Sequence, residues 1–138
     1  MLPFHLSFPV RDLASTRAFY GDLLACPAGR ATEQWIDYDF FGHQLSAHVA
    51  AATSEPAANC DMDGKEVPLR HFGAVLPWNR WEALARRLRD TGYPFSVAPH
   101  VRFAGEPGEQ GTFFLNDPSG NALEFKTYRH PAGVFAVA

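Results

Sequence analysis

The sequence predicts an α+β fold in which two βαβββ modules pair into a mixed sheet that forms a cleft. Three observations favour this fold. Strand-like and helix-like segments alternate, the order of one strand, one helix and three strands occurs twice, and a polar, turn-rich segment separates the two occurrences. We expect a single domain over residues 1–138, with module one at about 3–50, a linker at 51–66, module two at about 67–128 and a tail at 129–138.

Module one begins with a strand over residues 3–10, in which apolar side chains alternate with polar ones and His5 falls on the polar face. Asp12 is a suitable N-cap for the amphipathic helix that follows at 13–25, where apolar residues recur at helical spacing. The aromatic-rich sequence after the helix has strand character. Two alternating segments predict strands, at residues 34–41 and 44–50.

Module two repeats the pattern. The predicted elements are a strand at 68–77, a helix at 78–92, a strand at 93–103, a loop at 104–111 and a pair of strands within 112–128. The last two strands flank the turn sequence DPSG, whose proline and glycine favour a tight reversal. A βαβββ unit leaves one face of its sheet without cover from its own helix. Pairing two such sheets would therefore enclose a cleft.

Composition excludes several classes of protein. The chain is 46% hydrophobic and carries a formal net charge of −3, so it lacks the basic excess of a nucleic-acid or membrane-surface binder. No apolar run is long enough to span a membrane, and the N-terminal sequence does not resemble a signal peptide. We expect a cytoplasmic protein in which Cys26 and Cys60 are reduced thiols.

Three polar residues occupy special positions in the repeat. His5 and His71 lie in the first strands of the two modules, and Glu124 lies in the last strand of module two. Flanking residues on a strand point to the opposite face, so all three side chains could face the cleft. Two imidazoles and one carboxylate form a facial triad that suits Fe(II) and leaves coordination positions open for substrate and oxygen. Each residue taken alone could instead be a structural polar residue of the core or rim.

Two segments resemble the vicinal oxygen chelate superfamily, which includes glyoxalase I, extradiol dioxygenases and the bleomycin- and fosfomycin-resistance proteins. They are FHLSFPVRDLASTRAFYGDLL in module one and GTFFLNDPSGNALEF in module two, and the resemblance covers residues 3–128. It implies paired βαβββ modules with a metal in the cleft, and places the metal ligands at His5, His71 and Glu124. Fe(II) suits these ligands best, with Mn, Zn or Ni as alternatives.

The resemblance also distinguishes between activities. Glyoxalase-type isomerases place a carboxylate where this chain has Ser46, which favours the three-ligand arrangement of the dioxygenases. His48 shares a strand face with Ser46 and is the candidate catalytic acid or base. We therefore expect a metal-dependent, dioxygenase-like oxidoreductase acting on a small substrate whose vicinal oxygens chelate the metal. A glyoxalase-type isomerase or lyase and a metal-free antibiotic-binding protein are the alternatives.

The resemblance and the apolar tail around Val134, Phe135 and Val137 also predict a homodimer. The site would then be assembled within one chain or shared between two chains. Residues 51–66 are long enough to permit either arrangement.

Overall fold

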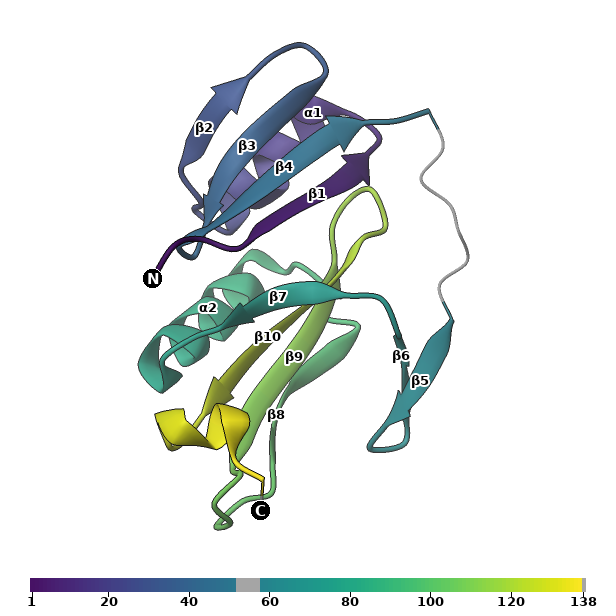
Figure 1. Cartoon of the computed structure of the whole chain (residues 1–138). Coiled ribbons are helices and arrows are strands. Elements are labelled where there is room, and N and C mark those ends of the chain that lie inside the picture. Colours follow the sequence, from purple (N-terminus) through teal and green to yellow (C-terminus); the bar gives the residue numbers. More distant parts are fainter. Residues whose placement is uncertain (52–57, 138) are drawn as a thin grey trace. The chain divides into compact units, whose positions relative to one another are not determined.

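The computed structural model, drawn in Figure 1, describes residues 1–51 and 58–137. The chain divides into two compact units. The N-terminal unit comprises Met1–Pro56 together with Asp117–Asn121, and the C-terminal unit comprises Ala57–Asn116 together with Ala122–Ala138. Each unit contains one four-stranded mixed sheet, so the predicted α+β class is confirmed.

The sheet of the N-terminal unit has the strand order β1-β4-β3-β2. β4 runs parallel to β1 and antiparallel to β3, so the first and last strands of the module are neighbours. The elements of this unit are β1 (His5–Val10), α1 (Leu13–Thr16), η1 (Arg17–Leu23), β2 (Ala28–Ala31), β3 (Trp35–Phe40) and β4 (His43–Val49). The order of one strand, one helical segment and three strands agrees with the predicted βαβββ module.

The helical segment differs from the ordinary amphipathic helix that the sequence predicts. Asp12 is the N-cap, and its carboxylate accepts a hydrogen bond of 2.6 Å from the backbone N–H of Ser15. After one turn of α-helix, the chain continues as the wider π-helix η1. The backbone N–H of Leu24 accordingly bonds to the carbonyl of Phe19, five residues earlier. Apolar spacing alone does not separate these two helical forms.

The two faces of this sheet have different roles. One face carries buried apolar residues that pack with the helical segment, which lies against the sheet in Figure 1. The core includes Phe8, Val10, Phe19, Tyr20, Ile36, Tyr38, Phe40, Leu45 and Ala47. The other face, which we call the open face, carries polar residues at the alternate positions of β1, β3 and β4. Its polar members are His5, Ser7, Asp37, Asp39, Gln44, Ser46 and His48.

The C-terminal unit repeats this topology. Its sheet has the order β7-β10-β9-β8, with β10 parallel to β7 and antiparallel to β9. Helix α2 covers one face through its buried residues Trp81, Leu84, Ala85 and Leu88, and it ends at Gly92 in a left-handed conformation. The elements are β7 (Phe72–Val75), α2 (Trp78–Thr91), β8 (Val97–Arg102), β9 (Gln110–Asn116), β10 (Ala122–Tyr128) and the 3₁₀-helix η2 (Pro131–Phe135) in the tail.

A β-hairpin precedes β7, within and just beyond the segment that the sequence predicts to be a linker. Its strands are β5 (Asn59–Met62) and β6 (Lys65–Pro68), and the remaining linker residues 52–57 lie outside the described residues. Asp63 and Gly64 both have positive φ angles, of 52° and 81°, which are the angles of a tight hairpin turn. The hairpin packs on its own unit, where Val67 forms a buried cluster with Val97 and Phe114.

The predicted turn at DPSG joins β9 to β10, and its residues belong to the N-terminal unit. The Tyr20 hydroxyl donates to the buried Asp117 carboxylate at 2.8 Å, and the Ser119 hydroxyl accepts from the backbone N–H of Arg11 at 2.9 Å. This part of the motif is therefore held by hydrogen bonds from η1 and from the residue that follows β1.

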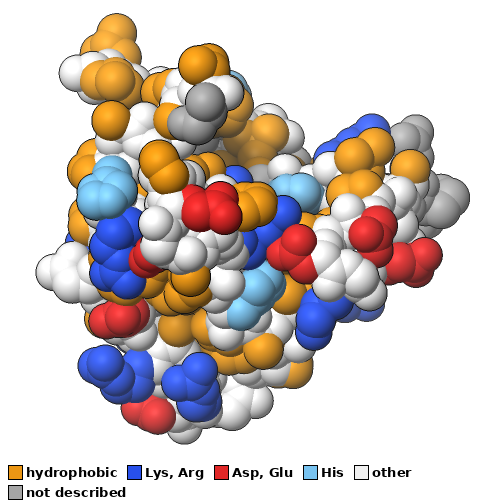
Figure 2. All heavy atoms as spheres, turned by 90° about the horizontal axis from the view of Figure 1, so that it is seen from below, with side chains coloured by type: hydrophobic (Ala, Val, Ile, Leu, Met, Phe, Trp, Pro, Cys, Tyr) orange, Lys and Arg blue, Asp and Glu red, His pale blue; other side chains and the backbone are white. Residues whose placement is uncertain are grey.

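Within the described residues, no helix combines the length and apolarity needed to cross a membrane. On the face shown in Figure 2, basic and acidic side chains are interspersed with apolar ones, and neither sign of charge covers a broad area. The tail exposes Phe135 and Val137 almost completely.

Candidate metal site

Two of the three predicted ligands meet in the C-terminal unit. Glu124 lies in β10, as expected, whereas His71 lies immediately before β7 rather than within a strand. The His71 Nε2 atom is 3.2 Å from the Glu124 Oε1 atom. Both side chains are largely sheltered, with 25% of His71 and 12% of Glu124 exposed. The assignment of these residues as metal ligands stays a prediction, and the position of His71 before β7 differs from the strand that the sequence predicts.

The other ring nitrogen of His71 determines what Nε2 can do. His71 Nδ1 is 2.7 Å from the carbonyl oxygen of Pro68, at the end of hairpin strand β6. A carbonyl oxygen only accepts hydrogen bonds, so Nδ1 must carry a proton. If the imidazole is neutral, Nε2 therefore presents a lone pair toward the Glu124 carboxylate oxygen. Nε2 and this oxygen would then both be acceptors, and at 3.2 Å they need a proton or a metal ion to bind them both. Either a proton on His71 or a bound metal ion meets this requirement.

Glu124 is oriented by a second contact. Its Oε2 atom accepts a short hydrogen bond from the hydroxyl of Thr112, which is fully buried on β9. Burial acts to raise the pKa of Glu124, but the hydrogen bonds from His71 and Thr112 outweigh it and hold that pKa below its usual value. The hydrogen bond to Glu124 raises the pKa of His71, against an opposing effect of burial. In the absence of metal, the pair therefore favours an imidazolium beside a carboxylate.

Gly73 permits the close approach of the two strands that carry the pair. It lies directly opposite Glu124 in the parallel register between β7 and β10. A Cβ atom built at Gly73 would lie 1.5 Å from the backbone carbonyl oxygen of Glu124. Any side chain at this position must push β7 away from β10, and would move His71 relative to Glu124.

The third predicted ligand, His5, lies in β1 on the open face of the N-terminal unit, opposite Gln44 in the register with β4. Its side chain is exposed and makes no hydrogen bond to any residue that the structure describes. His5 thus belongs to a different unit from His71 and Glu124, and the triad as a whole stays a prediction. No group of three metal-ligating residues is found within residues 1–51 and 58–137.

Ser46 occupies the open face of β4, two residues beyond Gln44. Its hydroxyl donates a hydrogen bond of 2.6 Å to the Asp37 carboxylate, which lies opposite it on β3. Asp37 also accepts from the Gln44 amide at 3.3 Å. A carboxylate therefore stands next to the serine, supplied by the neighbouring strand.

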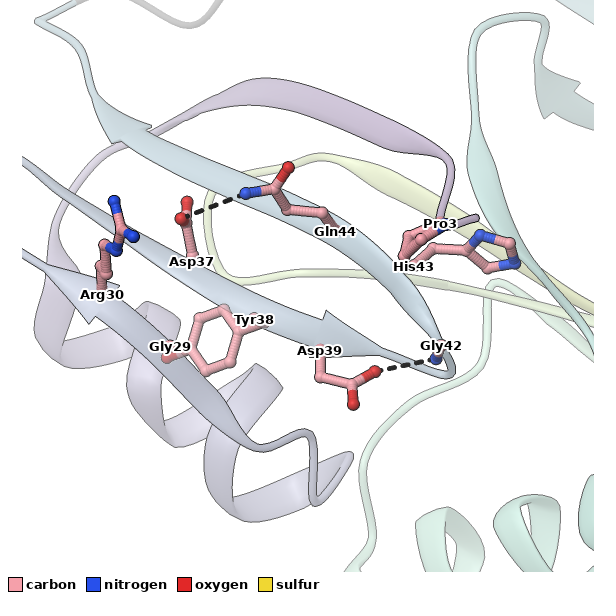
Figure 3. A pocket seen from close by; sticks show the side chains of 9 residues that line it. All are labelled: Pro3, Gly29, Arg30, Asp37, Tyr38, Asp39, Gly42, His43 and Gln44. Carbon is pink, nitrogen blue, oxygen red and sulfur yellow. Dashed lines mark hydrogen bonds between the residues drawn. The ribbon is translucent and has the colours of Figure 1, made fainter. Parts of the chain in front are cut away.

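A pocket of about 300 Å³ lies at this edge of the open face, and Figure 3 shows the residues that line it. Asp37 and Gln44 point toward one another across it, and Arg30 reaches in from β2. Pro3 and His43 complete its lining near the start of β1. The pocket lies beside the strand that carries His5, so the N-terminal unit offers space for a polar group close to that histidine.

His48, the candidate acid or base, lies exposed on the same face of β4. It stands opposite Trp35 on β3, and the two rings are 6.2 Å apart between centroids and tilted by 33°. In the part of the chain that the structure describes, neither ring nitrogen of His48 has a hydrogen-bond partner, and the side chain is exposed.

Sequence reasoning missed Thr112, Asp37 and the hairpin that carries Pro68. Asp37 was visible as a polar residue in an alternating strand, but its pairing with Ser46 depends on strand register. The hairpin had a recognisable signal, because Asp63-Gly64 lies between two short alternating segments and this dipeptide favours a two-residue hairpin turn.

Comparisons with known proteins agree with the fold. The family model described as Glyoxalase/Bleomycin resistance protein/Dioxygenase superfamily matches residues 3–125. A glyoxalase/bleomycin resistance protein/dioxygenase from Alicyclobacillus acidocaldarius is 34% identical, with a TM-score of 0.76 and coverage of 96% of both chains. Among curated proteins, no match is found.

More distant solved structures share the fold. A lactoylglutathione lyase from Agrobacterium tumefaciens is 14% identical, with a TM-score of 0.63 and coverage of 96% of this chain and 95% of that one. A fosfomycin resistance protein from Listeria monocytogenes is also 14% identical, with a TM-score of 0.66 and coverage of 90% of each chain. Together with the repeated βαβββ topology, the match of the family model shows that this chain belongs to the glyoxalase/bleomycin resistance protein/dioxygenase superfamily.

Proposed function

We propose that the chain binds one divalent metal ion through His5, His71 and Glu124, and uses it to act on a small substrate with vicinal oxygens. The observation that carries this proposal is the hydrogen bond from His71 Nδ1 to the Pro68 carbonyl, which directs the Nε2 lone pair at Glu124. Histidine ligands of metals are commonly oriented by such a bond at their other nitrogen. The donor set, two imidazoles and a carboxylate, suits Fe(II) and also accepts Mn, Zn or Ni.

The activity that we propose is dioxygenase-like. When bound, the metal would supply Lewis acidity that lowers the pKa of chelated substrate hydroxyls and orients them. His48 is exposed on the open face and would take up or return the hydroxyl proton at a ring nitrogen. Thr112 keeps the Glu124 carboxylate in one orientation, so that one oxygen stays directed at His71.

Metal analysis and oxygen uptake test this function together. Protein purified without chelators should contain about one metal ion per chain, and the Fe(II)-loaded form should consume oxygen when given a catechol. If the protein contains stoichiometric metal but takes up no oxygen, the proposed dioxygenase activity is contradicted and the proposed metal site still stands. Protein that binds a small molecule but no metal would instead be a metal-free binding protein.

An isomerase or lyase is the second candidate, and one observation favours it. The Asp37 carboxylate lies 2.6 Å from Ser46, close to the position where glyoxalase-type isomerases are expected to have a carboxylate. Asp37 could serve there as a base that moves a proton between neighbouring carbons of a chelated substrate. This candidate predicts turnover of a 2-oxoaldehyde thiol adduct by the Zn²⁺- or Ni²⁺-loaded protein without oxygen, and loss of that turnover in Asp37→Asn.

We further propose that the protein is a homodimer, supported by the exposed apolar side chains of the tail and by superfamily membership. Mixing His5→Ala chains with Glu124→Ala chains distinguishes the two site arrangements. A site shared between chains would regain metal binding at one of the two sites of the mixed dimer. A site within one chain would stay empty. Sedimentation as a monomer at micromolar concentration would contradict the dimer.

A further inference from the structure

Lys126 lies beside the His71–Glu124 pair. It follows Glu124 by two residues in β10, so both side chains project from the same face, with Cα atoms about 6.8 Å apart. A hollow of about 200 Å³ in the C-terminal unit is lined by His71, Glu124, Lys126 and residues 72–75. Lys126 is half-buried, and its positive charge acts on both members of the pair.

The ammonium group of Lys126 has no acidic partner in the part of the chain that the structure describes. Other basic groups of this unit do have such partners, since Arg102 pairs with Asp63 at 2.6 Å and Arg129 pairs with Glu109 at 2.8 Å. The contact of Lys126 that the structure does give is with the ring of Tyr128, 5.5 Å from the nitrogen to the ring centroid. A half-buried cation at the edge of a hollow, with no ion pair within the described residues, is suited to bind an anion.

Charge balance at a filled site leads to the same conclusion. A divalent metal brings two positive charges, Glu124 offsets one of them, and Lys126 adds one, while neutral histidines add none. Two positive charges therefore remain for the substrate to balance. Vicinal oxygens that bind the metal with loss of one proton balance one of these charges. A second negative charge on the substrate would balance the other.

We propose that Lys126 determines specificity by binding an anionic group of the substrate, such as a carboxylate, separate from the oxygens that chelate the metal. This inference rests on the proposed function and adds the substrate class to it, namely a vicinal-oxygen compound with a distinct acid group. The neighbouring lining of the hollow fits a compact organic acid. Val75 is half exposed opposite Lys126 in the strand register, and provides apolar contact next to the charge.

Binding of two matched probes to the Zn²⁺-loaded full chain tests the inference without turnover. The probes are catechol and 3,4-dihydroxybenzoate, which present the same vicinal hydroxyls and differ in one carboxylate. Titration calorimetry should show that the wild-type protein binds the carboxylate-bearing probe about 10- to 100-fold more tightly, the range expected for a charge-assisted hydrogen bond. Lys126→Met should bring the ratio of the two affinities close to one, and Lys126→Arg should largely restore it.

The chain's other lysine supplies a matched control. Lys65 is exposed on the hairpin, so Lys65→Met removes the same charge and should keep the full ratio. Metal content should be unchanged in all three variants. If Lys126→Met keeps the wild-type ratio, or if the wild type binds both probes equally, the inference is overturned while the metal site stands. If neither probe binds to metal-loaded protein, the proposed function fails, and the inference fails with it.

Discussion

The two units have the same strand order, but they differ in how firmly their candidate ligands are held in position. In the C-terminal unit, His71 and Glu124 are already in contact, and each is oriented by a further bond, to Pro68 and from Thr112. In the N-terminal unit, the His5 side chain is exposed and makes no hydrogen bond to the described residues. Repetition of a fold therefore reproduces strand positions, whereas the orientation of a ligand depends on residues that the two modules do not share, here Pro68 of the hairpin and Thr112 of the neighbouring strand.

The largest effect should come from removing the carboxylate of the preformed pair. Glu124→Ala should abolish stoichiometric metal binding, weakening affinity by more than about 100-fold, because loss of a direct ligand exceeds the 10- to 100-fold cost of losing an orienting residue. Elemental analysis and metal titration measure this. The control Glu106→Ala removes an exposed carboxylate from a loop of the same unit. Unchanged binding by Glu124→Ala would contradict the assignment of this ligand.

A second prediction concerns the open face of the N-terminal unit. His48→Ala should keep its metal and lower the turnover rate by roughly 10²- to 10⁴-fold, the range for loss of a general acid or base. His130→Ala, in the exposed tail, is the matched control. Loss of metal from His48→Ala would contradict this prediction, because His48 would then be a fourth ligand.

The third prediction tests the orienting bond of the C-terminal unit. Thr112→Val keeps the shape of the buried side chain but removes the hydroxyl that donates to Glu124. We expect metal affinity to fall by about 10- to 100-fold, with the ligand set intact. Ser46→Ala makes the corresponding change in the N-terminal unit and should leave metal affinity nearly unchanged. Equal losses in the two variants would mean that both units orient the metal.

The smallest effect should be a pH dependence of stability in metal-free protein. The pKa of His71 is raised, so its contribution is complete below the unfolded value near 6.5 and is lost as pH rises through the folded value. The pKa of Glu124 is lowered, so its contribution is present above 4.5 and is lost as pH falls through the folded value. The pair therefore stabilises the fold best between these two values.

Urea unfolding in the presence of a chelator measures this contribution. The excess in unfolding free energy of the wild type over Glu124→Gln should be about 1 kcal/mol larger near pH 5.5 than near pH 8.5. An excess that grows toward pH 8.5 would mean that the imidazolium is not the stabilised form. Asp37→Asn provides the comparison with a carboxylate of the N-terminal unit that has no histidine partner.

Much of this architecture could be predicted because it depends on local periodicity. Alternation indicated the strand that carries His5 and the two strands around DPSG, and helical spacing indicated α2, which spans Trp78–Thr91. The family motif then pointed to Glu124. These signals work because burial of one face of an element imposes a fixed period on its sequence.

Other features depend on contacts between residues far apart in the sequence, which periodicity does not report. The Asp37–Ser46 contact requires the register of β3 against β4, and the Thr112–Glu124 contact requires that of β9 against β10. The position of His71 before β7 follows from the hairpin, whose polar composition resembles that of a linker.

The close approach of β7 and β10 affects how the tolerance of each position to substitution would be interpreted. Gly73 has no functional group, yet a Cβ at that position would overlap the backbone of Glu124. In a saturation library selected for activity, position 73 should therefore tolerate substitution as poorly as the ligand positions do. A scan that ranks positions by intolerance would place this glycine among the ligands, and its intolerance would report the spacing of two strands rather than any reaction.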